Sequence, residues 1–489
     1  MAQSNSQSAN GSSESVETRL FINGEFQPSS DGKQFSLINP FTQESMAEVS
    51  QASEEDTNKA VTAAKAAFPA WRDRSPSDRG AYLRKLRDLI RESNDEFARL
   101  EALSTGKPVS SYFDANLAAD MFSYFSEAGW TVQGSSSLNT PGYFNMTIRQ
   151  PYGVVACIIP WNVPMGFFAL KVAPALAAGN TVVLKSSEKA PLTSALAARL
   201  IAKIGFPPGV INVLSGFGTP SGSTLAHHMD VRCISFTGSS FTGQKIQAAA
   251  AASNLKIVHM ELGGKSPALI FDDADLESAA QQTQFSIQMQ SGQACMANSR
   301  VYVQESVAEK FLALFKEKFG AGARLGNPLE PATSHGPQVD VLQYERVKSY
   351  LSIGEKDGKL SMGGDARDGY FIKPTVFENV PEDSRLAKEE VFGPVVVINT
   401  FKTEDEAIEK ANASEFGLYA SVFTKDIDRA VRASKLLEGG TVGVNCTSPT
   451  FALDMPFGGF KMSGIGREGY AHSLDNYLET KTILIKTSS

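Results

Sequence analysis

From Gly153 onward, short β-rich runs alternate with stretches that are long enough to form a helix. Five runs rich in β-branched and other apolar residues share this spacing: Val154–Ile159, Thr181–Leu184, Ile211–Val213, Cys233–Phe236 and Ile257–Met260. Strands joined through helices pair in parallel, because a crossover of this length returns the chain to the same end of the sheet. The alternation therefore predicts a parallel α/β sheet.

A second alternating series begins near Ser266. Its expected strands and helices are, in order, Pro267–Phe271, Leu276–Met289 (helix), Arg300–Val303, Val307–Phe319 (helix) and Val395–Phe401. A chain of 489 residues, of which 42% are hydrophobic, has enough apolar mass for more than one core. We therefore expect two α/β domains.

Other patterned segments flank these two series. An Ala-rich helix is expected at Asn58–Phe68, followed by one amphipathic helix with a charged outer face. Its apolar residues recur every three or four positions: Leu83, Leu86, Leu89, Ile90, Phe97 and Leu100. Polar and apolar residues alternate in Phe144–Arg149 and Thr480–Thr487, which predicts exposed strands whose edges need a partner.

Composition excludes several classes of partner. The formal net charge of −7 offers no basic surface for nucleic acid or an anionic membrane, and no run of about 18 consecutive apolar residues occurs. The four cysteines are widely spaced, without a CxxC pair or Cys/His cluster, so we expect no metal site and a reducing compartment. The first seventeen residues lack the apolar core of a signal peptide, and we expect a disordered tail on a cytoplasmic protein.

Three polar residues stand where chemistry is plausible. Cys295 follows an expected helix in Gly-Gln-Ala-Cys-Met, although a single cysteine is more often a small core residue than a nucleophile. Glu261 ends an expected strand and precedes two glycines in Met-Glu-Leu-Gly-Gly-Lys-Ser-Pro; the alternative is a solvated glutamate in a turn. Asn162 lies between Pro160 and Pro164, where rigid backbone suits an oxyanion donor or, alternatively, a helix N-cap.

In this order, these three segments resemble the signatures of the aldehyde dehydrogenase superfamily. Three further segments match: Phe-Thr-Gly-Ser at 236–239 with Gly243, Glu-Glu-Val-Phe-Gly-Pro at 389–394, and Pro-Phe-Gly-Gly-Phe-Lys-Met-Ser-Gly at 456–464. The resemblance runs from about residue 20 to the C-terminus. It implies two parallel-sheet, Rossmann-like domains of the α/β class with a small β oligomerisation extension.

The resemblance also implies domain boundaries. A tail would span residues 1–17, and the NAD-binding domain would combine 18–130 with 150–261 and a return at 461–477. The catalytic domain would span 262–460, and the oligomerisation strands would lie in 131–149 and 478–489.

For the reaction, the resemblance implies oxidation of an aldehyde through a thioester on Cys295. Asn162 and the backbone N–H of Cys295 would hold the oxyanion, and Glu261 would take a proton from the water that hydrolyses the thioester. Lys171 matches a family lysine that assists proton movement, although a lysine on a helix face is more often simply solvated.

The implied cofactor is NAD, with NADP possible. Lys185 and Glu188 would contact the adenosine ribose, where a carboxylate repels a 2′-phosphate, although some relatives with this glutamate accept both cofactors. Gly238 and Ser239 would open a helix toward the pyrophosphate. Further implied cofactor contacts are Trp161, Glu390 and Phe392. The run Gly216–Gly222 is spaced GxGxxxG and contains a proline, so it is not the usual Rossmann motif. The resemblance implies that this run lies near the adenine. The alternative is an ordinary turn without cofactor contact.

The implied substrate is an uncharged aliphatic or aromatic aldehyde. The positions that line the substrate tunnel in relatives are all apolar here: Val163, Phe167, Leu170, Met289, Phe451 and Phe457. Val163 and Leu170 replace aromatic residues of several relatives, which predicts a wider tunnel. Gly443 also stands where an aromatic residue is frequent, and the Thr447–Asp454 loop matches no familiar substrate subgroup. A homodimer or homotetramer is expected, joined through the edges of the extension.

Three other functions stay open. An acylating relative that passes the thioester to coenzyme A generally lacks the base, so Glu261 argues against it. A hydrolytic thiol enzyme needs a histidine beside Cys295, and none of the five histidines lies in a recognisable pairing motif. A non-enzymatic binding role leaves the nucleophile, base and oxyanion residues without a purpose.

Overall fold

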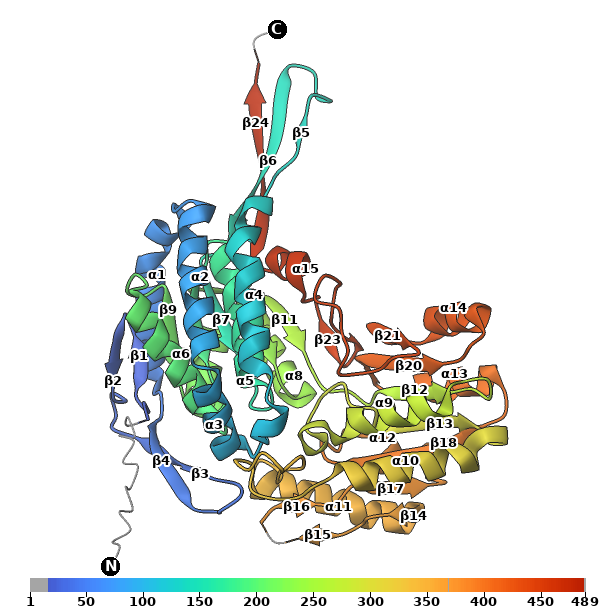
Figure 1. The fold of residues 1–489 in the computed structure, drawn as a ribbon. Coiled ribbons are helices and arrows are strands. Elements are labelled where there is room, and N and C mark those ends of the chain that lie inside the picture. Colours follow the sequence, from blue (N-terminus) through green and yellow to red (C-terminus); the bar gives the residue numbers. More distant parts are fainter. Residues whose placement is uncertain (1–15, 368, 488–489) are drawn as a thin grey trace, which may run out of the picture.

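The computed structural model describes residues 16–367 and 369–487, so the first fifteen residues of the expected tail lie outside the described residues. Figure 1 shows two lobes, each built on its own sheet, and a narrow arm that projects from the first lobe. Both large sheets contain parallel strands flanked by helices, as the alternation predicts. Among the described residues, no helix is long and apolar enough to cross a membrane.

The first sheet has eight strands in the order β2-β1-β9-β8-β7-β10-β11-β23. Its five parallel strands confirm the five expected ones: β7 (Val154–Ile158), β8 (Thr181–Lys185), β9 (Ile211–Leu214), β10 (Val231–Thr237) and β11 (Ile257–Glu261). The sequence patterns missed three very short antiparallel members: β1 (Leu20–Ile22), β2 (Glu25–Gln27) and β23 (Gly464–Ile465). Strands of two or three residues carry too little alternation to be recognised.

Helices cover both faces of this sheet. Buried residues of α5 (Pro164–Ala177), α6 (Pro191–Ile204), α2 (Pro76–Glu92) and α4 (Asp114–Ala128) pack on one face. Those of α1 (Glu54–Arg72), α7 (Ser223–His227) and α8 (Ser240–Ala252) pack on the other.

The single amphipathic helix expected through Leu83 and Leu100 is a wrong prediction. Two helices occur, α2 and α3 (Asn94–Thr105), and Ser93 leaves the helical path between them with φ −96° and ψ 12°. Ile90 and Phe97 are buried in the same core, so the apolar spacing continues across the break and conceals it.

The second sheet has seven strands in the order β14-β17-β18-β13-β12-β20-β21. The three expected strands are confirmed: β12 (Pro267–Ile270), β13 (Arg300–Gln304) and β18 (Val395–Phe401). Four were missed: β14 (Lys359–Met362), β17 (Thr375–Glu378), β20 (Tyr419–Phe423) and β21 (Thr441–Val444). The expected helices correspond to α9 (Leu276–Gln288) and α10 (Ala308–Gly322), and α11 (Val341–Asp357), α13 (Glu404–Asn412) and α14 (Ile427–Leu436) complete the covering layers.

The arm joins segments far apart in the sequence. β6 (Tyr143–Pro151) pairs antiparallel with β24 (Leu478–Lys486) over nine residue pairs, and β5 (Ser136–Ser137) adds a short third strand (Figure 1). β6 contains the alternating segment Phe144–Arg149, and β24 contains the segment Thr480–Thr487 except for its last residue. The domain boundaries inferred from the sequence remain a prediction.

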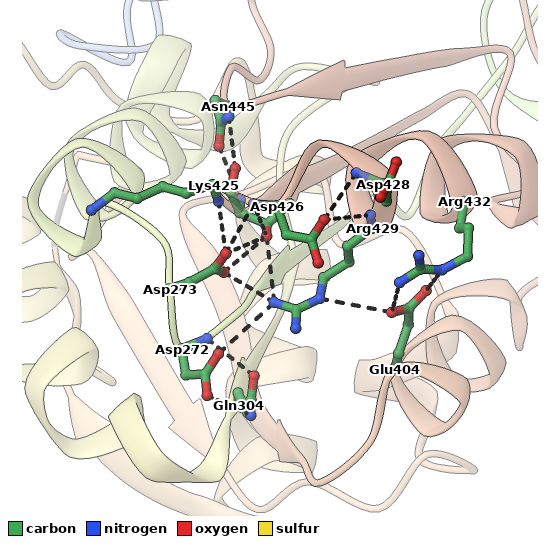
Figure 2. Close-up of polar contacts among 11 residues, drawn as sticks. Asp272, Asp273, Gln304, Glu404, Lys425, Asp426, Asp428, Arg429, Arg432 and Asn445 are labelled. Carbon is green, nitrogen blue, oxygen red and sulfur yellow. Dashed lines mark hydrogen bonds and ion pairs between the residues drawn. The ribbon is translucent and has the colours of Figure 1, made fainter.

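Each sheet has a reversal point, where the chain continues in opposite directions from two neighbouring parallel strands, and ligands of doubly wound folds bind outside the carboxyl ends of the strands at such a point. In the second sheet the reversal lies between β12 and β20, and the protein's own charged groups occupy it (Figure 2). Asp273 accepts hydrogen bonds of 3.0 Å from the backbone N–H groups of Lys425 and Asp426 and from Arg429. Arg429 also lies 3.7 Å from Glu404. In the first sheet the reversal lies between β7 and β10, where a cavity opens.

Candidate active site

A cavity of about 640 Å³ lies at the reversal point of the first sheet. Its walls include Trp161, which follows β7, and Gly238 and Ser239, which follow β10. Lys185 at the end of β8 and Glu188 line it as well. The cavity therefore brings together five residues that the sequence assigns to cofactor binding, in a volume suited to a nucleotide.

Local geometry makes this cavity fit for a dinucleotide. Ser239 caps α8 by accepting a hydrogen bond from the Thr242 N–H, and the first turn of α8 faces the cavity, which favours a phosphate there. Gly238 is required by space, because a Cβ atom would come within 2.5 Å of the Phe236 ring. Burial lowers the pKa of Lys185 to about 8.

The Gly216–Gly222 run also reaches this cavity. Gly218, Thr219 and Gly222 line its wall beside His227. Residues Gly218–Gly222 form a short irregular segment that leads into α7, in which Thr219 is extended with φ −119° and ψ 129°, and they do not form the loop of a Rossmann fingerprint. Contact of this segment with the cofactor therefore stays a prediction.

A second cavity of about 200 Å³ shares Trp161, Gly238 and Ser239 with the first and continues from it. Its other lining residues include five predicted site residues: Asn162, Phe167, Cys295, Glu390 and Phe392. The two cavities together form a path from Lys185 and Glu188 to the Cys295 thiol.

Cys295 reaches this cavity through an irregular loop. α9 ends at Gln288, and Gln290 and Ser291 then adopt the left-handed conformation with φ 52° and 55°, followed by Gly292 at φ 77°. The Cys295 thiol donates a hydrogen bond of 3.1 Å to Oε1 of Glu261, which ends β11. The expected nucleophile and base are therefore in direct contact.

Burial sets the proton affinities of this pair. Burial raises the pKa of Glu261 to about 7, and the charge of Glu468 adds to the rise. Burial and the neighbouring Glu261 carboxylate raise the pKa of the Cys295 thiol. A thiol that is protonated at neutral pH needs a base within reach, and Glu261 is that base in geometry.

Lys171 is buried, so the alternative of a solvated helix lysine is wrong. Its Nζ donates hydrogen bonds to Glu468 at 2.8 Å and to Ser235 at 3.1 Å. Glu468 was missed by the sequence reasoning, because an isolated acidic residue in a loop 297 positions away carries no local signal. The charge pair lies close enough to act on the pKa of Glu261.

Asn162 is buried and its Nδ2 donates a hydrogen bond of 3.0 Å to the backbone carbonyl of Gln293. Val163 at the next position is the N-cap of α5 and makes no side-chain capping bond, so Asn162 itself does not cap the helix. The alternative reading of Asn162 as an N-cap is therefore wrong, and its amide is directed to the loop that carries Cys295.

Glu390 and Phe392 form the wall opposite Gly263. Glu390 accepts a hydrogen bond of 2.9 Å from the Gly264 N–H, and burial raises the pKa of Glu390 to about 7. Phe392 has φ 60° and its ring lies 5.5 Å from that of Trp161 in an edge-to-face contact.

Comparison with known proteins agrees with this geometry. The family model described as "Aldehyde dehydrogenase family" matches residues 26–483. The chain belongs to the aldehyde dehydrogenase family. Oxidation of an aldehyde to a carboxylic acid is accordingly its reaction, and a nicotinamide cofactor is the family's oxidant.

Curated relatives cover the chain almost completely. An aldehyde dehydrogenase of Alternaria alternata is 45% identical over 477 residues, which are 96% of this chain and 95% of the relative. Human retinal dehydrogenase 2 is 45% identical over 478 residues, or 96% and 92% of the two chains.

Solved structures of the family share the fold. A P. syringae indole-3-acetaldehyde dehydrogenase variant, in complex with NAD+ and IAA, has a TM-score of 0.94 at 38% identity and covers 97% of each chain. Betaine aldehyde dehydrogenase of Staphylococcus aureus, in complex with NAD+, has a TM-score of 0.93 at 38% identity and covers 97% and 95%. The expected family and α/β fold class are confirmed.

Two further residues line the inner cavity of this aldehyde dehydrogenase and were missed from the sequence. Gln343 and Arg346 lie one turn apart on α11. Gln343 donates a hydrogen bond of 2.7 Å to the Phe392 carbonyl, and Arg346 donates one of 2.7 Å to the Glu390 carbonyl. Their position on an ordinary amphipathic helix gives no sign that they face a cavity.

Only one of the six predicted substrate residues lines the inner cavity. Phe167 lines the inner cavity with Cys295. Leu170 packs against the core beside the first sheet and Met289 against the core beside the second. Phe451 and Phe457 contact each other, with ring centroids 5.8 Å apart, and Val163 is half-buried. These five do not line the cavity around Cys295, so their role in a tunnel stays a prediction.

Proposed function

We propose that this aldehyde dehydrogenase oxidises an uncharged aliphatic or aromatic aldehyde with NAD, through a thiohemiacetal and a thioester on Cys295. The observation that carries the proposal is the 3.1 Å hydrogen bond between the Cys295 thiol and Glu261. Cys295 lines the inner cavity, which shares Trp161, Gly238 and Ser239 with the cofactor-sized cavity, and the buried Glu261 lies directly beside the thiol. A nucleophile, its base and a nucleotide path thus converge on one point.

In the first step, Glu261 accepts the thiol proton as Cys295 Sγ adds to the aldehyde carbon. The resulting oxyanion would be held by the Asn162 amide and by the backbone N–H of Cys295. Loss of one such donor typically costs about 3 kcal/mol of barrier. Asn162 lines the same cavity as Cys295, which supports this assignment.

NAD, when bound, supplies the acceptor for the hydride that leaves the thiohemiacetal carbon. Lys185 and Glu188 would hold its adenosine ribose, and the first turn of α8 its pyrophosphate. Glu390 and Phe392 would contact the nicotinamide end. The Glu188 carboxylate disfavours a 2′-phosphate, so NAD is preferred over NADP.

Glu261 first releases the thiol proton to solvent, which restores the carboxylate, and the Cys295 thiolate that leaves on hydrolysis regains a proton from solvent. In the last step, Glu261 takes a proton from the water that attacks the thioester. The Lys171–Glu468 pair lies close enough to alter the pKa of Glu261 and would pass this proton onward. An acylating enzyme is the main alternative. Adding coenzyme A distinguishes them, because our proposal predicts free carboxylic acid as the product and no acyl-coenzyme A.

The decisive assay follows NADH formation with a panel of aldehydes. Cys295→Ala should abolish turnover, with a loss of at least about 10³-fold, because no other group can form the thioester. Cys446→Ala is the matched control, since Cys446 is half-buried and lies outside both cavities. Substantial activity in Cys295→Ala would overturn the mechanism.

Substrate size is the finer part of the proposal. Val163 and Leu170 replace aromatic residues of several relatives, and the relatives include dehydrogenases of retinal and of indole-3-acetaldehyde. We expect higher kcat/KM for longer or aromatic aldehydes than for acetaldehyde. The wide-tunnel idea fails if acetaldehyde exceeds every larger aldehyde in the panel. A homo-oligomer in the cytoplasm completes the proposal.

A further inference from the structure

Gln293 lies two residues before Cys295 and is almost completely buried. All four of its polar groups make hydrogen bonds. Its backbone N–H donates to the Gln290 carbonyl, and its own carbonyl accepts from Asn162 at 3.0 Å. Its Nε2 donates to the Gln290 carbonyl at 2.9 Å, and its Oε1 accepts from the Val339 N–H at 2.9 Å.

The bond from Asn162 fixes the direction of the oxyanion donor. An amide nitrogen carries two hydrogens, and the Gln293 carbonyl takes only one of them. With that hydrogen held, rotation of the Asn162 amide is blocked and the second hydrogen keeps a defined direction. Asn162 and Cys295 line the same cavity, so the direction of this second hydrogen decides how well Asn162 can donate a hydrogen bond to the oxyanion.

The side-chain bonds of Gln293 secure a turn that is unfavourable by itself. Gln290 and Ser291 are not glycines, yet both have positive φ, a conformation that persists only when the surroundings enforce it. Gly292 is required at the third position, because a Cβ atom there would lie 2.1 Å from the Gly393 carbonyl. The same turn carries Cys295 into the cavity.

The partner of this turn is the segment 336–339. Ser291 donates a hydrogen bond of 2.7 Å to the Gly336 carbonyl, and Gln338 donates one of 3.1 Å to the Ser291 carbonyl. The segment leads directly into α11, whose residues Gln343 and Arg346 line the inner cavity. Gln293 thus connects the nucleophile loop, the oxyanion donor and the wall of the cofactor path.

We infer that Gln293 is a positioning residue for acylation, which orients Asn162 through its carbonyl and holds the Cys295 loop through its side chain. This inference rests on the proposed function. Gln293 is not among the lining residues of either cavity, and its effect passes through Asn162 and Cys295.

Gln290 provides a matched control. It belongs to the same turn and has a side chain of the same size that is also buried. Neither its Oε1 nor its Nε2 has a hydrogen-bond partner among residues 16–367 and 369–487. Replacing its amide by an apolar group of similar size therefore removes no bond.

The test compares Gln293→Met, Gln293→Glu and Gln290→Met in the full-length enzyme. The pre-steady-state burst of NADH, normalised to alkylatable Cys295, should slow about tenfold or more in Gln293→Met, because small misplacements of reacting groups are costly. Gln293→Glu keeps the acceptor for the Val339 N–H, so its burst should slow less than that of Gln293→Met. The KM for NAD should change less than about twofold, a split that a general loss of structure would not produce.

Hydrogen exchange gives a readout that needs no substrate. Backbone amides of residues 290–295 should exchange faster in Gln293→Met and as in the wild type in Gln290→Met. A burst within about twofold of the wild type, an equal slowing in Gln290→Met, or slowing without faster exchange would each overturn the inference. A wild-type enzyme that oxidises no aldehyde would instead overturn the proposed function, and the exchange comparison would still report on Gln293.

Discussion

At the scale of single residues, burial changes the chemistry of the groups around Cys295 more than any individual charge does. Burial is the largest cause of the raised pKa of Glu261, Glu390 and the Cys295 thiol. An exposed glutamate is ionised and a weak base at neutral pH. A buried one whose pKa is about 7 is matched to the task of proton transfer at that pH.

The pH dependence of the enzyme follows from Glu261. The carboxyl is protonated and unable to accept a proton below pH 7, so kcat/KM should rise with pH through about 7. Glu261→Gln should lower kcat/KM by at least about 10²-fold at pH 7, because a general base contributes that much. Its residual rate should rise only at the higher pH where the thiol ionises by itself.

Glu389→Gln is the control for that profile. Hydrogen bonding to Arg385 holds the pKa of Glu389 at about 2, so it does not titrate near pH 7. The kcat/KM of Glu389→Gln should therefore still rise with pH through about 7. If the kcat/KM of Glu261→Gln also rose through pH 7, the titration would belong to another group.

Cofactor preference also belongs to this scale. Glu188 lines the larger cavity beside Lys185, where its carboxylate would meet the adenosine ribose. Glu188→Gln removes the charge that opposes a 2′-phosphate, and the ratio of kcat/KM for NADP to that for NAD should rise about tenfold. The ratio is measured with one aldehyde at fixed pH. An unchanged ratio would show that other residues select the cofactor.

At the scale of elements, buried charges join α3 to α4. Lys107, in the connection between α3 and α4, contacts Glu101 at 2.7 Å and Asp114 at 2.8 Å. All three side chains are almost completely buried. The surface network around Arg429 in Figure 2 is more exposed, and pairs of that kind contribute less.

Removing the cation from the Lys107 cluster leaves two buried carboxyl groups without compensation. Lys107→Met should lower the free energy of unfolding by about 3–5 kcal/mol. Urea unfolding at pH 7 measures this as a lower midpoint with an unchanged m-value. Lys85→Met, on the exposed face of α2, should unfold as the wild type does. Equal midpoints for the two variants would contradict the assigned role of the cluster.

At the scale of the whole molecule, the arm is the feature that a monomer does not explain. β24 is an edge strand of a three-stranded sheet, and Leu484 and Ile485 on it are 65% and 45% exposed. Apolar residues on an unpaired strand edge invite a second chain. β21 is likewise an edge of the second sheet.

Charged residues on this arm should separate the subunits. The wild type should have a mass that is a multiple of the 52.5 kDa chain by light scattering, as a dimer or tetramer. Leu484→Glu with Ile485→Glu should shift it toward the single-chain mass, because two like charges oppose edge pairing. Lys481→Glu, a change at an already polar exposed position of β24, is the control. A wild-type mass of 52.5 kDa would refute the oligomer.

The sequence by itself determined the alternating elements and the chemical residues that lie in signature segments. Parallel strands β7 to β11 and the candidates Cys295, Glu261 and Asn162 were predictable, because strand periodicity and motifs are local properties of the chain. The tertiary structure decided which of these residues meet. Cys295 and Glu261 are 34 positions apart, and Lys171 and Glu468 are 297 apart, so no local pattern announces either contact.

Residues that hold the motif residues in place are also invisible to local patterns, because their contacts join distant parts of the chain. Gln293, Gln343 and Arg346 are ordinary residues in their own segments, and they gain a role only where α9, α11 and the loop after β7 converge. Burial is likewise a property of the folded chain. It raises the pKa of Glu261 to about 7, which no inspection of its neighbours in sequence would reveal.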